Sequence, residues 1–159
     1  MDLAYTLPRS PRLTFHGVAM VARTADKARA AAEGTLGTYT YACRMSRLLF
    51  AFLETTADAF QAATVATSDD VGIERFVFDR LQALRRTASE VEAFNRSIYS
   101  PPTTDAIHDF LEERREAVPS RPDIWTYVDL IDAEEGREVP LRHDTPEWAA
   151  SPDSRPSSA

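Results

Sequence analysis

Cys43 is the side chain best suited to covalent chemistry, because a thiolate is a strong nucleophile. It is the 1 cysteine of the chain, so it cannot form an internal disulfide. A nucleophilic cysteine needs a base, and of the three histidines His16 and His108 are the candidates for that role. Cys43 lies among apolar residues near the start of an expected helix, where a single cysteine is usually a small buried hydrophobic residue. We therefore predict that the chain is not an enzyme.

Metal and nucleotide chemistry require residue patterns that are missing from this sequence. His108 and Glu112 stand four positions apart on an expected helix, but a di-iron carboxylate bundle needs Glu-x-x-His on two helices. The chain has 5 glycines and none of the glycine-rich loops that bind phosphate groups. We therefore predict that the protein needs neither a metal nor an organic cofactor.

Paired arginines are the remaining chemical signal. Arg85–Arg86 and Arg114–Arg115 could contact phosphate, yet acidic residues flank both pairs, and ion pairing along exposed helix faces explains them more simply. The net charge of −7 makes nucleic acid an unlikely partner. Residues 1–68 carry a net charge of +2 and residues 69–159 carry −9, a polarity that can orient associating subunits.

The N-terminal part of the chain predicts an arm followed by helical structure. Residues 1–23 contain two prolines and read as an extended arm, with a possible strand over residues 13–22. Residues 24–118 form the expected helical domain. It begins with a short helix over residues 25–33, which Gly34 should end.

Two long helices are expected in the centre of the chain. Apolar residues recur at spacings of three and four within 36–66, and again from Asp69 to Tyr99, where the pattern predicts one continuous helix. Such helices, joined by a few polar residues, should pack as an antiparallel hairpin. A third, short helix is predicted over residues 104–118.

The C-terminal part has a different composition. Residues 124–131 are rich in β-branched and aromatic side chains, which predicts a small β-hairpin within residues 119–142. Residues 143–159, rich in proline and serine, read as an extended tail with Trp148 as its anchor. The expected fold class is thus mainly α: a long antiparallel helical hairpin, a short third helix, a small β-hairpin and extended N- and C-terminal arms.

The expected function is a non-catalytic structural subunit that packs into a multi-subunit complex. A two-helix hairpin cannot bury aromatic residues on both faces, so part of that surface is free for a partner. Virion connector and shell components share this general build, although no motif here identifies such a family. The predicted protein interface consists of Phe50, Phe76, Phe78 and Trp148.

The alternative is a small helical ligand-binding regulator or enzyme, with a pocket between the hairpin and residues 124–141. Its candidate residues are Tyr39, Tyr41, His16, His108 and Trp125. No apolar run approaches the ~20 residues that span a bilayer, and the first residues do not form a secretory signal. We therefore expect a cytoplasmic or virion location, no membrane partner, and association with copies of the chain or other protein subunits.

Overall fold

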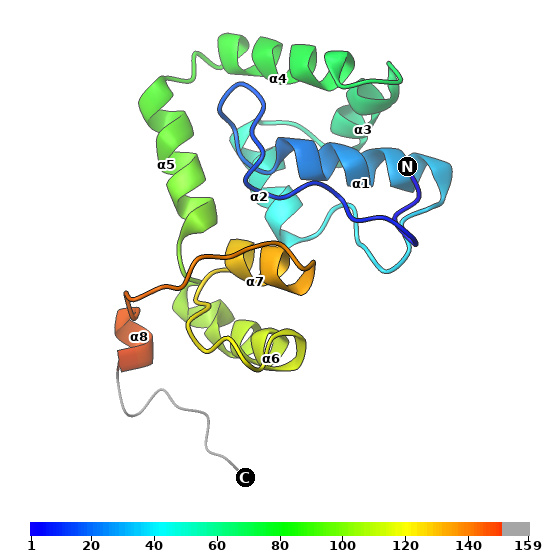
Figure 1. Cartoon of the computed structure of the whole chain (residues 1–159). Coiled ribbons are helices and arrows are strands. Elements are labelled where there is room, and N and C mark those ends of the chain that lie inside the picture. The colour runs from blue at the N-terminus through cyan, green and yellow to red at the C-terminus, as the bar shows by residue number, and fades with distance from the viewer. Residues whose placement is uncertain (151–159) are drawn as a thin grey trace. The chain divides into compact units, whose positions relative to one another are not determined.

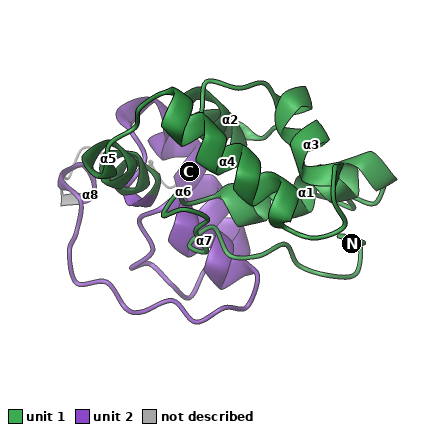
Figure 2. Ribbon diagram, turned by 90° about the horizontal axis from the view of Figure 1, so that it is seen from above, with its two compact units in different colours: residues 1–98 green, residues 99–159 purple. Residues whose placement is uncertain are grey.

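The computed structural model describes residues 1–150 of the chain, and these residues are mainly helical and form no sheet (Figure 1). The chain divides into two compact units, which we call unit 1 (Met1–Ile98) and unit 2 (Tyr99–Ala159) (Figure 2). Each has its own buried residues and is described by itself.

Unit 1 is built around a buried helix. Its helices are α1 (Val21–Glu33), α2 (Arg44–Phe52), α3 (Ala57–Val65), α4 (Val71–Ala83) and α5 (Ala88–Tyr99), the last of which ends at the boundary between the units. Helix α1 packs on α3, and α3 also packs on α2 and α4. Every residue from Val21 to Ala28 is buried, including Arg23, Asp26 and Lys27. Charged side chains in such a position are stable only when they are paired within the unit.

The N-terminal segment packs within unit 1 and is not a free arm. Leu3 is buried, and its N–H donates to the Thr35 carbonyl oxygen at 2.8 Å. The predicted strand over residues 13–22 is wrong. Phe15 and Val18 form only an isolated bridge, because the chain turns through left-handed backbone between them and α1 follows directly.

The predicted long antiparallel hairpin is not confirmed, because each of its two expected helices is interrupted. The segment 36–66 contains α2 and α3, and the segment 69–99 contains α4 and α5. Figure 1 shows α5 turning away from α4 instead of continuing it. The apolar spacing runs through both interruptions, so spacing alone does not reveal them.

Local hydrogen bonds explain where the new helices begin. The Thr56 hydroxyl oxygen accepts the Ala59 N–H at 3.1 Å and caps α3. Thr87 and Glu90 form a reciprocal capping box before α5: the Glu90 carboxylate accepts the Thr87 N–H at 2.8 Å, and the Thr87 hydroxyl accepts the Glu90 N–H at 3.2 Å. Arg85, with φ of 52°, has left-handed backbone in the turn that precedes this box.

The junction between α3 and α4 is closely packed around Gly72. A Cβ atom on Gly72 would lie 2.7 Å from the Ala63 carbonyl oxygen and 2.9 Å from the Thr67 hydroxyl oxygen. Alanine would gain up to about 1 kcal/mol of helix propensity. We nevertheless expect Gly72→Ala to lower the free energy of unfolding by about 1–2 kcal/mol, because overpacking against backbone outweighs that gain.

Urea unfolding measures this change, and Val71→Ala is the matched control at an exposed neighbouring position, with an expected change below about 0.5 kcal/mol. A Gly72→Ala protein as stable as the parent would contradict the close approach of α3 to α4.

Unit 2 contains a second, smaller core. Its elements are the 3₁₀ helix η1 (Thr104–Ala106) and the helices α6 (Ile107–Ala117), α7 (Tyr127–Glu134) and α8 (Glu147–Ala150). Helix α6 packs on α7, and the core consists of Phe110, Ile124 and Leu130. The expected third helix over residues 104–118 therefore corresponds to η1 and α6.

The predicted β-hairpin within residues 119–142 is wrong, because most of its first strand is helix α7. The Thr126 hydroxyl oxygen accepts the Asp129 N–H at 3.1 Å, and this N-cap starts the helix despite the β-branched composition. Asp129 and Asp132 are buried and form ion pairs with Arg142 and Arg137, respectively. These pairs hold the returning segment against α7 as coil, not as a strand.

The predicted C-terminal tail is only partly described. Residues 143–146 have no regular structure and are followed by the short helix α8. Residues 151–159 of the predicted tail lie outside the part of the chain that the structure describes.

Candidate thiol site in unit 1

Cys43 and Lys27 form a direct contact between two helices. Cys43 is the N-cap residue of α2, and its Sγ lies 3.1 Å from the Nζ of Lys27 on α1. Lys27 is 3% exposed and also donates to the Thr40 carbonyl oxygen at 3.0 Å, whereas the cysteine is partly exposed. A buried ammonium group is thus held beside the thiol of a partly exposed residue. Such electropositive and accessible surroundings are typical of reactive cysteines.

Hydroxyl groups from both helices complete the site. The buried Ser46, in the first turn of α2, places its Oγ 3.5 Å from the Cys43 Sγ. The Thr24 hydroxyl lies 3.4 Å from the same Ser46 oxygen. Thr24 and Lys27 are three residues apart and so share one face of α1. This face therefore fixes both the ammonium group and the hydrogen-bonded pair that adjoin the thiol.

The site favours the thiolate form of Cys43. Burial alone would raise the pKa of the thiol, but the Lys27 ammonium group and hydrogen bonding by Ser46 lower the pKa to about 7, from an ordinary value of 9.0. The N-terminus of a helix also favours a negative charge. Near neutral pH, about half of the molecules should therefore carry the thiolate, the form of cysteine that acts as a nucleophile.

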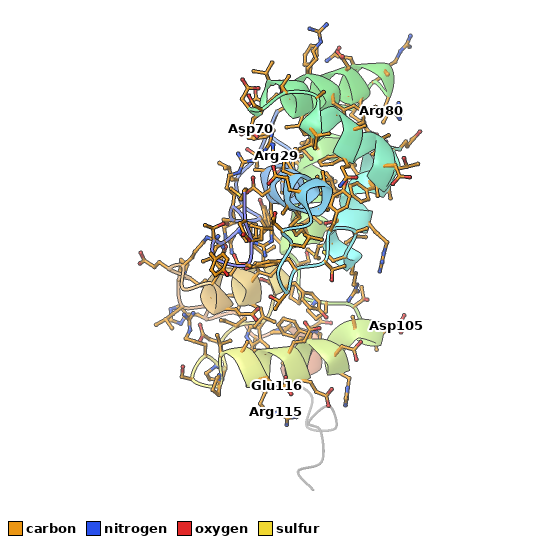
Figure 3. All side chains as sticks on the ribbon, turned by 90° about the vertical axis from the view of Figure 1, so that its right-hand side faces the viewer. Arg29, Asp70, Arg80, Asp105, Arg115 and Glu116 are labelled. Carbon is orange, nitrogen blue, oxygen red and sulfur yellow. The ribbon has the colours of Figure 1, made fainter. Side chains whose placement is uncertain are left out.

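A second charged cluster holds α1 in place, and we call it the clamp: Arg9, Asp26, Arg29 and Asp70. Arg9 reaches Asp26 at 2.7 Å and Asp70 at 2.6 Å, and Arg29 reaches Asp70 at 3.0 Å. Figure 3 labels Arg29 and Asp70 at this contact. Burial acts to lower the pKa of Arg9, but the two carboxylates together outweigh burial, and the pKa of Arg9 is raised above its ordinary value. Hydrogen bonding by Arg9 in turn lowers the pKa of Asp70. The clamp ties the N-terminal segment and the start of α4 to α1, the helix that carries Lys27.

Apart from Cys43, the residues predicted for chemistry do not contribute to the thiol site. The His16 ring packs against Phe78 with 5.5 Å between ring centroids. His108 is exposed, and its Nε2 lies 3.7 Å from the carboxylate of Glu112. The groups that contact the thiol are instead Lys27 and Ser46, neither of which was predicted from the sequence. Lys27 was recognisable in the sequence in one respect, because it is the only lysine in the chain.

Of the pocket residues proposed for the alternative function, the two tyrosines are used inside unit 1. The Tyr41 hydroxyl donates to the Ala57 carbonyl oxygen at 2.7 Å, and burial raises the pKa of this phenol. The Tyr39 ring lies beneath the guanidinium group of Arg23, at 5.6 Å. Trp125 belongs to unit 2, where it lies edge to face with Trp148 at 5.4 Å.

The four predicted interface residues have different surroundings. Phe50 is 6% exposed and packs between Tyr41 and Phe60, and Phe76 meets Phe60 edge to face. Trp148 is partly buried against Trp125. Phe78 remains 44% exposed and is therefore the one of the four that presents a large apolar surface to solvent.

Within residues 1–150, no three histidine, cysteine, aspartate or glutamate side chains converge in a way that could hold a metal ion. Nor does this part of the chain contain a helix long and apolar enough to cross a bilayer.

These features define a two-unit, mainly helical protein with a buried lysine beside a partly exposed thiol. The chain belongs to the family DUF5069, described as a domain of unknown function, whose model matches residues 5–137. No curated protein is similar enough to match the chain. The matched segment includes Lys27 and Cys43 and ends before Trp148.

Proposed function

We propose that unit 1 acts through reversible chemistry at Cys43, as a thiol that forms mixed disulfides with a small thiol or with a partner protein. The contact between the Lys27 ammonium group and the Cys43 sulfur carries this proposal. It favours the thiolate at neutral pH, and a thiol with a pKa near ambient pH is the best compromise between thiolate fraction and nucleophilicity.

The proposed reaction is thiol–disulfide exchange. The Cys43 thiolate attacks one sulfur of a disulfide, a new S–S bond forms, and the other sulfur departs as a thiolate. In the reverse direction Cys43 is the leaving group, and Lys27 stabilises its negative charge. The same contact therefore promotes both formation and release of the adduct, as a reversible modification requires.

Adduct formation also changes unit 1 electrostatically. It replaces a thiolate with a neutral sulfur and so removes the attraction between that negative charge and the Lys27 ammonium group. The folded state loses the stabilisation that this attraction provides. We therefore expect the modified chain to unfold at a lower temperature, which would make Cys43 a sensor of the thiol redox state.

Oxidised glutathione tests the proposal directly. We expect the folded, full-length chain at pH 7 to gain one glutathione by intact-mass analysis, and to lose it again when reduced glutathione is added in excess. Cys43→Ser is the control that should gain none. If the folded chain stays unmodified while the urea-unfolded chain reacts, the thiol is not available in the folded state and the proposal fails.

Association with copies of the chain is the second candidate, and the 44% exposure of Phe78 favours it. The charge difference of +2 against −9 between residues 1–68 and 69–159 would orient such subunits. We expect the native mass in solution to exceed that of one 17.7 kDa chain, and Phe78→Ser to reduce it. Val65→Ser removes another exposed apolar side chain as the control. A monomer at all accessible concentrations would contradict this candidate.

A further inference from the structure

Unit 2 contains a cavity of about 350 Å³ next to the C-terminal end of α6. Its apolar lining includes Leu111, Trp125 and Trp148. The two indole rings meet edge to face at 5.4 Å and form an aromatic wall. The volume is at the small end of the range of ligand sites in proteins, so it suits a compact ligand with an aromatic or aliphatic body.

The charged lining of the cavity is entirely basic. Three arginines, Arg114, Arg115 and Arg121, line it, and no acidic residue does among the residues described. Arg121 is paired with Asp123 at 2.8 Å. The other two have no carboxylate within 4.0 Å in the described chain. Among the described residues, neither of these two arginines therefore forms an ion pair.

Arg114 shows the cost of this arrangement. Its guanidinium group lies 5.0 Å from the centre of the Trp125 ring and donates to the Pro122 carbonyl oxygen at 2.7 Å, so it is held in position. Burial lowers its pKa, and Asp123 only partly opposes this effect. An anion in the cavity would relieve the unfavourable burial of this charge.

Arg115 adds donors at the cavity, and among the described residues the indole of Trp148 has an unpaired donor of its own. Arg115 lies in the last turn of α6, where Figure 3 labels it beside Glu116. The indole N–H of Trp148 is buried and has no hydrogen-bond acceptor in the part of the chain that the structure describes. Buried donors are normally paired, so this one requires an acceptor from beyond the described residues.

We propose that this cavity binds a small amphiphilic oxyanion, a carboxylate or phosphate monoester carried on an aromatic or aliphatic body. The guanidinium groups of Arg114 and Arg115 bind the oxygens, because their planar donors match carboxylate and phosphate geometry. The tryptophan wall packs against the body of the ligand. This site lies in unit 2 and is independent of the chemistry proposed for Cys43.

The tryptophans provide a direct readout, because the 2 tryptophans of the chain both line the cavity. We would titrate the full-length protein with 4-phenylbutyrate, 4-phenylbutyl phosphate and the uncharged 4-phenylbutan-1-ol while recording tryptophan fluorescence. One of the two anions is expected to bind with a dissociation constant of about 0.1–1 mM. The alcohol should bind at least 10-fold more weakly. The tighter anion identifies the headgroup.

Charge variants locate the site. Arg115 is exposed, so Arg115→Gln should leave the fold intact. This variant should weaken anion binding at least 5-fold and leave binding of the alcohol unchanged. Arg75→Gln, an exposed arginine of unit 1, makes the same change in net charge and should leave the affinity unchanged. The proposal is overturned if neither anion changes the fluorescence at 10 mM, if the alcohol binds as tightly as the anions, or if both variants behave alike.

Discussion

Replacing Asp26 with alanine is expected to lower the free energy of unfolding by about 3–5 kcal/mol, the largest loss of stability that we predict for a single substitution. The Asp26 side chain is 2% exposed and pairs with Arg9, whose backbone N–H it also accepts at 2.8 Å. Its removal leaves a partly buried guanidinium group and a backbone donor without this acceptor. Denaturant unfolding followed by circular dichroism measures the change.

The control for this prediction is Asp79→Ala, because Asp79 pairs with Arg75 on the exposed face of α4. Exposed ion pairs contribute little, so the expected loss is below about 0.5 kcal/mol. Equal stabilities of the Asp26 and Asp79 variants would show that the clamp does not hold α1.

The clamp should also make stability depend on pH. Hydrogen bonding by Arg9 lowers the pKa of Asp70 in the folded state below its ordinary value of 3.8. Since the unfolded chain binds this proton more readily, the contribution of Asp70 is complete above the ordinary pKa. It is lost as pH falls below 3.8 and through the lowered folded-state value. Asp70→Asn should therefore reduce the difference in stability between pH 6 and pH 3.

Lys27→Met is expected to have the largest effect on chemistry. Without the ammonium group, burial raises the pKa of Cys43 toward or above its ordinary value of 9.0. The thiolate fraction at pH 7 then falls about 50-fold, and the higher intrinsic nucleophilicity of the more basic thiolate recovers part of this loss. We expect the rate of reaction with oxidised glutathione at pH 7 to fall about 5- to 10-fold.

Two comparisons make this result interpretable. Urea-unfolded Lys27→Met should react at the same rate as the urea-unfolded parent, since the unfolded chain has no contact between Lys27 and Cys43. Ser46→Ala removes only the hydroxyl near the sulfur and should slow the reaction less than Lys27→Met does. Equal rates for the folded parent and folded Lys27→Met would mean that Lys27 does not control the thiol.

The helical character of the chain was predictable, but the interruptions of its helices were not predicted. Apolar spacings of three and four persist through residues 84–87, because Leu81 before the break and Phe94 after it are both buried in unit 1. The capping box of Thr87 and Glu90 was readable as a Thr-x-x-Glu pattern and should have outweighed that spacing.

In helix α7, too, local polar groups outweigh the pattern of apolar residues. Residues 124–131 have the composition of a strand, yet Thr126 and Asp129 form an N-cap, and the paired carboxylates of the helix require the arginines that follow it. Composition favoured a strand, whereas capping and ion pairing favour a helix. The local polar groups determine the outcome because buried carboxylates must be paired.

The thiol site could be predicted only in part. Cys43 was recognisable as the possible nucleophile, but its partner lies 16 residues away on a different helix. That contact depends on the burial of α1 with its charged residues, which no periodic pattern indicates. A histidine base was the expected partner of the thiol, whereas unit 1 provides a fixed ammonium group that lowers the pKa of the thiol directly.

The pH dependence of Cys43 alkylation is the most direct test of the central claim. The rate of reaction of the folded chain with iodoacetamide, measured by intact mass between pH 5 and pH 10, should rise to half its maximum at pH about 7. A midpoint at or above 9.0, the ordinary value of a cysteine thiol, would contradict the account, because the Lys27 contact would then not stabilise the thiolate.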